Sequence, residues 1–138
     1  MSFLKKLIRK KKEEVKFAAS QEIKKTELEE ICGDDRETYN ALKETMFLDP
    51  RKIGTTMEDA EKKAKEFEKS GDTPKATSWY KIAGGVAIHE GKVKKVKEYF
   101  GACQRLSGKE YLILKNPEEA VQKAQEYYQK YLKEEEKK

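Results

Sequence analysis

The sequence has few of the residues that carry catalysis or bind metals. Its 138 residues include one histidine and two cysteines. With a single histidine, a His-based metal site or a catalytic triad has little support. Cys32 and Cys103 lie far apart and form no C-x-x-C pair, so we interpret them as small buried hydrophobic residues, with a disulfide between them left open. The sequence therefore predicts no enzyme activity, no catalytic residues, no metal and no cofactor.

Long hydrophobic runs are also missing. No stretch approaches the ~20 apolar residues of a membrane-spanning helix. The start of the chain has only the doublets Phe3-Leu4 and Leu7-Ile8, which do not form the apolar core of a signal peptide. These absences predict a cytoplasmic protein, with a peripheral membrane position as the alternative. Charged residues make up 41% of the chain and hydrophobic residues 36%. Such heavy use of Lys and Glu is also a tendency of hyperthermophile proteins.

Two short patterns resemble known motifs without meeting their requirements. Gly85 and Gly91-Lys92 are spaced one residue too widely for a phosphate-binding loop, and Val93 stands where that loop needs Ser or Thr. His89-Glu90 does not begin an H-E-x-x-H zinc motif, because Val93 also takes the place of the second histidine. We interpret His89 as a helix-end residue and the glycines as close-contact points in a packed helix.

Positive charge is concentrated near the start of the sequence. The net charge of the whole chain is +5. Residues 1–16 contain seven basic and two acidic residues, so the remainder is neutral. With Phe3, Leu4, Leu7 and Ile8, these lysines form an amphipathic pattern that suits an anionic membrane surface. Nucleic-acid phosphates and packing on the domain or a second subunit, hence a homo-oligomer, are the alternatives left open. The candidate anion-binding residues are Lys5, Lys6, Arg9, Lys10, Lys11 and Lys12.

The segment Thr73–Gly91 is apolar around almost its whole circumference, which predicts a helix buried on most sides. Thr73 is expected to cap it, Pro74 suits its first position, and Gly91 can end it. We expect Trp79 to be a core residue. Tyr127, Tyr128 and Tyr131 recur at helical spacing and are expected to pack in the core with their hydroxyls in water.

Helical periodicity and helix-start signals continue on both sides of this segment, whereas good strand signals are lacking. They predict an all-α fold, an antiparallel array of about six helices with short connections. The expected helices span residues 2–31, 34–48, 57–70, 73–91, 92–108 and 117–132. The expected divisions are a basic arm at 1–33, a helical domain at 34–134 with its core at 57–107, and a charged tail at 135–138.

A pattern in the middle of the chain is written twice, twenty residues apart. Each copy has six positions. In order they are a small residue, an apolar residue, a turn glycine, a small or short residue, an aromatic residue and a small residue. The first copy is Ala64, Phe67, Gly71, Ala76, Tyr80 and Ala83. The second copy is Gly84, Ala87, Gly91, Val96, Phe100 and Cys103. Small residues let antiparallel helices approach closely, and the aromatic residue fills the space where each pair diverges.

This pattern resembles the tetratricopeptide-repeat family, and Met57–Ile88 has the extent of one repeat. In that family the next repeat would begin about 34 residues later, whereas here the helix 73–91 would be shared by two hairpins. The resemblance covers residues 57–107, with the helix 117–132 as the candidate closing helix. The resemblance implies a non-enzymatic adaptor that binds a protein or peptide in a groove. The groove residues expected on this basis are Glu61, Lys65, Glu68, Lys81, Gly85 and His89.

Overall fold

The computed structural model describes residues 27–46 and 49–132, and this part of the chain contains helices and no strands. The predicted all-α fold is therefore confirmed. Residues 27–32 are helical and precede the labelled elements. These are α2 (Arg36–Thr45), η1 (Pro50–Lys52), α3 (Met57–Lys69), α4 (Thr73–Glu90), α5 (Val93–Ser107), η2 (Leu112–Lys115), α6 (Pro117–Tyr127) and η3 (Tyr128–Leu132).

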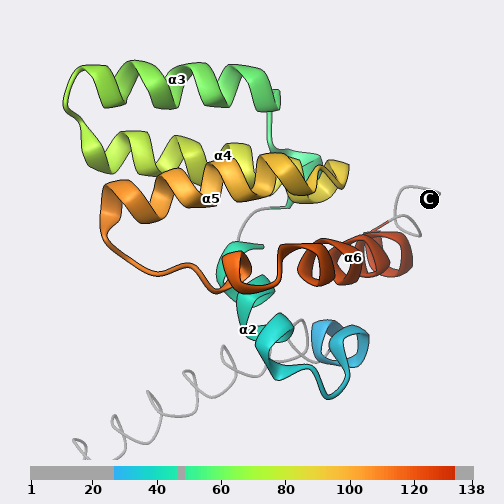
Figure 1. The fold of residues 1–138 in the computed structure, drawn as a ribbon. Coiled ribbons are helices and arrows are strands. Elements are labelled where there is room, and N and C mark those ends of the chain that lie inside the picture. Colours follow the sequence, from blue (N-terminus) through green and yellow to red (C-terminus); the bar gives the residue numbers. More distant parts are fainter. Residues whose placement is uncertain (1–26, 47–48, 133–138) are drawn as a thin grey trace, which may run out of the picture.

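Helices α3, α4 and α5 are consecutive and antiparallel, with α4 in contact with both of its neighbours (Figure 1). This confirms the arrangement expected for residues 57–107. Helices α2 and α6 pack against each other and against α4, and the short η2 segment packs on α2 (Figure 1). The central position of α4 explains its apolar sequence, because it is covered from several sides at once.

Most predicted helix starts agree with the structure. The side chains of Asp35, Thr56 and Asn116 accept hydrogen bonds from backbone amides in the first turns of α2, α3 and α6. For α4 the prediction was wrong by one residue. The carboxylate of Asp72, rather than the hydroxyl of Thr73, accepts the first-turn amide of Lys75 at 3.2 Å. Aspartate is among the strongest N-cap residues, and its negative charge also favours the helix N-terminus.

The two turns that flank α4 have the same geometry. Gly71 and Gly91 both adopt left-handed backbone conformations, with φ of 83° and 72°. In each turn the glycine amide donates to the carbonyl three residues earlier, and the next amide donates to the carbonyl five residues earlier. Those second bonds, Asp72 to Phe67 and Lys92 to Ala87, are both 2.9 Å long. This bonding is a Schellman-type helix end, which favours glycine. The twenty-residue pattern therefore encodes two equivalent helix ends.

The two adjacent glycines of α4 have different surroundings. A Cβ atom on Gly84 would lie 2.5 Å from Cε2 of Phe100, whereas a Cβ on Gly85 would meet no atom within 4 Å. Gly84 is thus the predicted close-contact point between α4 and α5. The same expectation was wrong for Gly85, because no neighbouring atom lies within 4 Å of an added Cβ there and the position is only half-buried.

The core lies mainly between α4, α5, α6 and α2. Its largest fully buried side chains include Tyr99, Phe100, Leu42, Ile88 and Ile113. Ile113 lies in the 3₁₀ turn η2, which falls between the expected helices 92–108 and 117–132. Trp79, in contrast, is only half-buried, and so is Phe67. Trp79 was expected in the core, but it lies on the outer face of the α3–α4 hairpin, the face that borders the α2–α3 connection. The Phe67 ring lies beside Lys75 of α4, whose Nζ is 5.4 Å from the ring centre.

Candidate functional site

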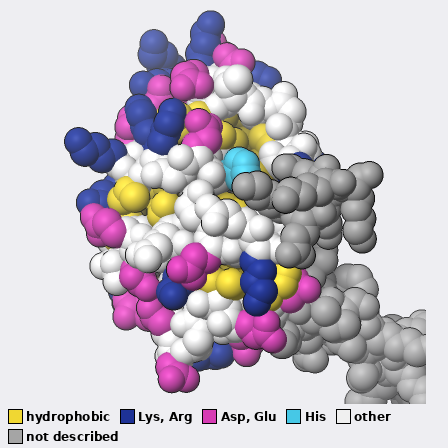
Figure 2. Space-filling view, turned by 90° about the vertical axis from the view of Figure 1, so that its right-hand side faces the viewer, with side chains coloured by type: hydrophobic (Ala, Val, Ile, Leu, Met, Phe, Trp, Pro, Cys, Tyr) yellow, Lys and Arg dark blue, Asp and Glu magenta, His cyan; other side chains and the backbone are white. Residues whose placement is uncertain are grey.

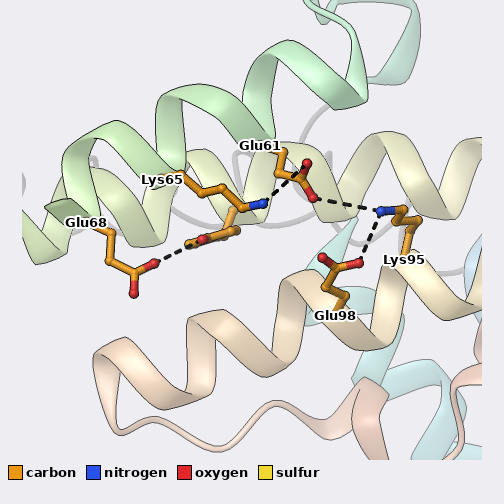
Figure 3. A network of polar contacts seen from close by, with 6 residues as sticks. Glu61, Lys65, Glu68, Lys95 and Glu98 are labelled. Carbon is orange, nitrogen blue, oxygen red and sulfur yellow. Dashed lines mark hydrogen bonds and ion pairs between the residues drawn. The ribbon is translucent and has the colours of Figure 1, made fainter.

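Three of the predicted groove residues lie on α3 and face α5. The Glu61 carboxylate is 3.8 Å from Nζ of Lys65 and 3.8 Å from Nζ of Lys95 on α5. Lys95 is also 3.2 Å from the carboxylate of Glu98 (Figure 3). This surface carries both signs of charge in alternation. Its side chains are therefore engaged with each other across the two helices.

Glu68 connects three helices. Its carboxylate accepts hydrogen bonds from the Tyr80 hydroxyl on α4 at 3.0 Å and from the Arg105 guanidinium on α5 at 3.0 Å. The hydrogen bond from Arg105, followed by that from Tyr80, lowers the pKa of Glu68. Burial and the neighbouring Glu68 carboxylate raise the pKa of Tyr80 to about 12. A residue with these partners holds helices together, and its carboxylate is not free for a ligand.

The other three predicted groove residues lie on α4 beside different elements. Nζ of Lys81 is 5.8 Å from the ring centre of Tyr111, in the segment that follows α5. The His89 ring packs edge-on against Tyr128, with ring centres 5.0 Å apart. Gly85 lies between them. The structure thus brings Glu61, Lys65 and Glu68 together on the α3–α5 side. It places Lys81, Gly85 and His89 along a stripe of α4 that runs toward η2 and η3.

The last turn of α4 is held by a side chain from α6. The amide nitrogen of Gln125 donates to the carbonyls of Ile88 at 2.6 Å and His89 at 2.8 Å. The last carbonyl groups of a helix lack the usual amide partner one turn further on. The Ile88 carbonyl accepts from the Gly91 amide as well, so Gln125 adds a second bond there and also supplies a donor to the His89 carbonyl. His89 is therefore in a helix-end position, as predicted. It belongs to a structural contact between α4 and the C-terminal helix.

The predicted anion-binding residues lie outside the described residues. These are Lys5, Lys6, Arg9, Lys10, Lys11 and Lys12.

A cleft that sequence reasoning did not find lies on the opposite side of α3 from Glu61. It has a volume of about 760 Å³ and is formed by the α2–α3 connection, α3 and α4. Its lining residues are Asp49, Lys52, Ile53, Gly54 and Thr55 from the connection, Asp59, Lys62, Lys63 and Glu66 from α3, and Trp79 and Ile82 from α4. This volume falls in the usual range for ligand pockets.

The apolar part of the cleft is made by Ile53, Trp79 and Ile82, all of which are half-buried. Trp79 and Ile82 are three residues apart, so they lie on one face of α4. Nζ of Lys63, on α3, is 4.5 Å from the centre of the Trp79 ring. This distance is typical of a cation–π contact. The half-buried indole thus packs against the core and is also contacted by the exposed side chain of Lys63.

Charged groups surround this apolar surface. Asp49 is held by Arg51, whose guanidinium donates to it at 3.0 and 2.7 Å. The hydrogen bonds from the Arg51 side chain lower the pKa of Asp49 to about 2. Within the described part of the chain, no carboxylate lies at ion-pair distance from Lys52, Lys62 or Lys63. The cleft therefore combines an apolar surface with ammonium groups that have no ion-pair partner there.

The cysteines provide no reactive group. Cys32 and Cys103 are both free and buried, so they do not form the disulfide that the sequence left open. Burial raises the pKa of the Cys103 thiol to about 12, and its sulfur lies 3.6 Å from the carbonyl oxygen of Thr77. A thiol with a raised pKa is a poor nucleophile at neutral pH, because the thiolate is the reactive form. Among residues 27–46 and 49–132, no group of three or more His, Cys, Asp or Glu side chains is placed to hold a metal ion.

One face of the molecule is mixed in charge (Figure 2). Figure 2 shows Lys and Arg side chains interspersed with Asp and Glu over one face, with small hydrophobic areas between them. No helix in the described ranges combines the length and the apolar character needed to cross a bilayer.

Comparison with known proteins does not assign this fold to a family. The chain matches no protein-family model, no curated protein and no solved structure. The tetratricopeptide resemblance therefore stays a prediction based on residues 57–107.

Proposed function

We propose that this protein is a non-enzymatic, cytoplasmic interaction module that binds a peptide segment of a protein partner. The observation that carries the proposal is the 760 Å³ cleft with Ile53, Trp79 and Ile82 at its surface. Half-buried tryptophan in a concave site is typical of residues that dominate binding energy in protein interfaces. The tetratricopeptide resemblance supports the same class of function, because it implies an adaptor.

The location of the proposed site differs from the groove expected from sequence. Glu61 and Glu68 are engaged in contacts between α3, α4 and α5. A ligand on that face would have to compete with these contacts. In the cleft, an apolar side chain of a ligand that packs on Trp79 would displace the exposed Lys63 side chain. The outer face of the α3–α4 hairpin is thus the more accessible site for an apolar side chain of a ligand.

The test is a selection of short random peptides on the full-length protein, followed by titration of the selected peptides. Trp79 is the only tryptophan of the chain, so its fluorescence reports directly on the cleft. We expect binding to change this fluorescence and to be lost in Trp79→Ala. Gly54→Gln provides a second variant, because an added Cβ at Gly54 meets no atom within 4 Å and the new side chain would lie at the cleft wall.

A double variant, Lys65→Glu with Lys81→Glu, is the matched control. Both lysines lie outside the cleft, and both belong to the groove expected from sequence. Selected peptides that bind Trp79→Ala and Gly54→Gln as tightly as the wild type would refute the cleft as the binding site. If only the double variant loses binding, peptide binding would be assigned to the groove expected from sequence and not to the cleft. Circular dichroism of each variant establishes that the helical fold is retained.

A second candidate function follows from the concentration of charge in residues 1–16, which carry seven basic and two acidic residues. This segment suits an anionic surface, either a membrane or a nucleic acid. Flotation with anionic liposomes and a gel-shift assay, each with and without residues 1–16, test it. Unchanged behaviour after the deletion in both assays would remove this function.

A further inference from the structure

The side chain of Lys63 lies over the apolar surface of the cleft. Its Nζ atom is 4.5 Å from the centre of the Trp79 ring, within the reach of about 6 Å that a cation–π contact has. Lys63 belongs to α3 and Trp79 to α4, so the contact joins two elements of the lining. An ammonium of the chain itself therefore occupies the face of the indole on which an apolar side chain of a ligand would pack.

Two carboxylates on α3 are placed to receive this ammonium when it leaves the indole. Asp59 precedes Lys63 by four residues and Glu66 follows it by three, and side chains at these spacings meet on a helix surface. Both carboxylates line the cleft, both are exposed, and neither forms an ion pair within the described part of the chain. Glu61 and Lys65, which have the same four-residue spacing on α3, do form one at 3.8 Å. Helix α3 thus offers Lys63 a second position away from Trp79.

The two positions of Lys63 differ little in free energy. A cation–π contact at an exposed site favours the ammonium on the ring by about two- to fivefold in population. An ion pair between exposed side chains one turn apart in a helix is weaker, and favours its own state by about 1.5- to twofold. The balance lies toward the indole, as the structure shows. The side chain is not fixed there, because exposed side chains change rotamer within picoseconds to nanoseconds.

We infer that Lys63 is a cover built into the cleft, which lies on Trp79 in the free protein and moves to Asp59 or Glu66 when an apolar side chain binds. The cover regulates the proposed peptide-binding site and rests on that proposal. It lowers the affinity for any ligand that packs on the indole, because only the uncovered fraction of the protein is competent to bind. The size of this effect depends on the chain's own carboxylates and not on the charge of the ligand.

The cover is tested first in the free, full-length protein. Trp79 is the only tryptophan, so acrylamide quenching of its fluorescence measures the access of small molecules to the indole. Lys63→Ala removes the cover. Lys62→Ala is the matched control, because Lys62 is the adjacent exposed lysine of the same lining and makes no cation–π contact with Trp79 in the described ranges. We expect quenching to increase in Lys63→Ala alone. Wild-type quenching in Lys63→Ala, or an equal increase in both variants, would overturn the inference.

Binding tests the second position of Lys63. The probes are peptides with blocked ends, selected on the full-length protein from a library that lacks Asp, Glu, Lys, Arg and His. Because these peptides carry no charge, changes of charge in the cleft act on their binding through the cover. Their affinity, measured by calorimetry, should rise about twofold in Lys63→Ala and fall about twofold in Asp59→Asn with Glu66→Gln. In the triple variant the two carboxylate changes should have no effect beyond that of Lys63→Ala.

Two results would overturn the inference and leave the proposed function intact. In both, the binding of the uncharged peptides depends on Trp79. One is an affinity that Lys63→Ala leaves unchanged or lowers. The other is an effect of the carboxylate changes that persists without Lys63. Peptides whose binding is indifferent to Trp79→Ala, or a selection that enriches none, would overturn the cleft-binding function and the regulatory role of Lys63 together.

Discussion

Replacing Gly84 by alanine should destabilise the protein, whereas the same change at Gly85 should stabilise it. Both glycines lie inside α4, where alanine is favoured over glycine by about 1 kcal/mol. At Gly85 an added Cβ meets no atom within 4 Å, so only this gain applies. At Gly84 the Cβ would lie 2.5 and 2.7 Å from two ring carbons of Phe100. Carbon atoms prefer separations of about 3.5–4.0 Å, so the ring must move by about 1 Å.

Phe100 has little freedom to make that movement. Its side chain is 0% exposed, and its ring centre lies 5.8 Å from that of Tyr111. Protein interiors are close-packed, and forcing an extra methyl group into such a site costs about 1–3 kcal/mol. With the overlap seen here, we expect a value near 3 kcal/mol. After the alanine gain, Gly84→Ala should be less stable than the wild type by about 2 kcal/mol.

The assay is denaturant and thermal unfolding followed by helical circular dichroism. Gly84→Ala and Gly85→Ala should differ by about 3 kcal/mol in the free energy of unfolding, or about 10 °C in Tm for a chain of this length. In a Phe100→Leu background the ring is gone, so Gly84→Ala should cost little, which a double-mutant cycle measures. Equal stability of the two alanine variants would refute the close contact between α4 and α5.

Three further predictions concern contacts that join the helices. Glu68→Gln should lower stability by about 1 kcal/mol at neutral pH, because it weakens the hydrogen bonds from Arg105 and Tyr80. Because the pKa of Glu68 is lowered in the folded protein, this contribution to stability is present above the unfolded pKa and is lost as the pH falls below about 4. The stability curves of the variant and the wild type should therefore converge below about pH 4. A constant difference down to low pH would contradict this. Gln125→Ala removes the two hydrogen bonds to the end of α4 and should lower the free energy of unfolding by about 1–2 kcal/mol. The control Gln122→Ala, at an exposed position of the same helix, should lower it by less than about 0.5 kcal/mol. Equal losses in the two variants would argue against the helix-end contact. Because the pKa of Tyr80 is raised to about 12, stability should be full below pH ~10 and fall as the pH rises toward 12. Tyrosinate absorbance should show one late-titrating group fewer in Tyr80→Phe, and an unchanged titration would refute the assignment.

Local sequence signals predicted the helices well, because their causes are local. A cap at Thr56, a cap and proline at Asn116-Pro117, and left-handed glycines at 71 and 91 each act within one turn of chain. The error at the start of α4 has a similar origin. Asp72 and Thr73 are adjacent and both can cap a helix, and the sequence pattern does not choose between them.

The expected site could not be predicted equally well, because it depends on which helix covers which face. Trp79 and Tyr80 are adjacent aromatic residues in the same apolar helix, yet Tyr80 is 5% exposed and contacts Glu68, while Trp79 opens into the cleft. Gly84 and Gly85 differ in the same way. Adjacent residues of a helix point about 100° apart, so the rotation of α4 between its neighbours decides their roles.

The sequence by itself determined the helical class, the boundaries of the main helices and the two equivalent turns around α4, since these follow from residue conformations and short-range hydrogen bonds. Only the tertiary structure decided that Glu68 joins three helices, that Gln125 holds the end of α4, and that the α2–α3 connection forms a cleft with Trp79. Each of these contacts joins residues that are distant in the chain. Their formation depends on the packing of whole helices, which no local pattern records.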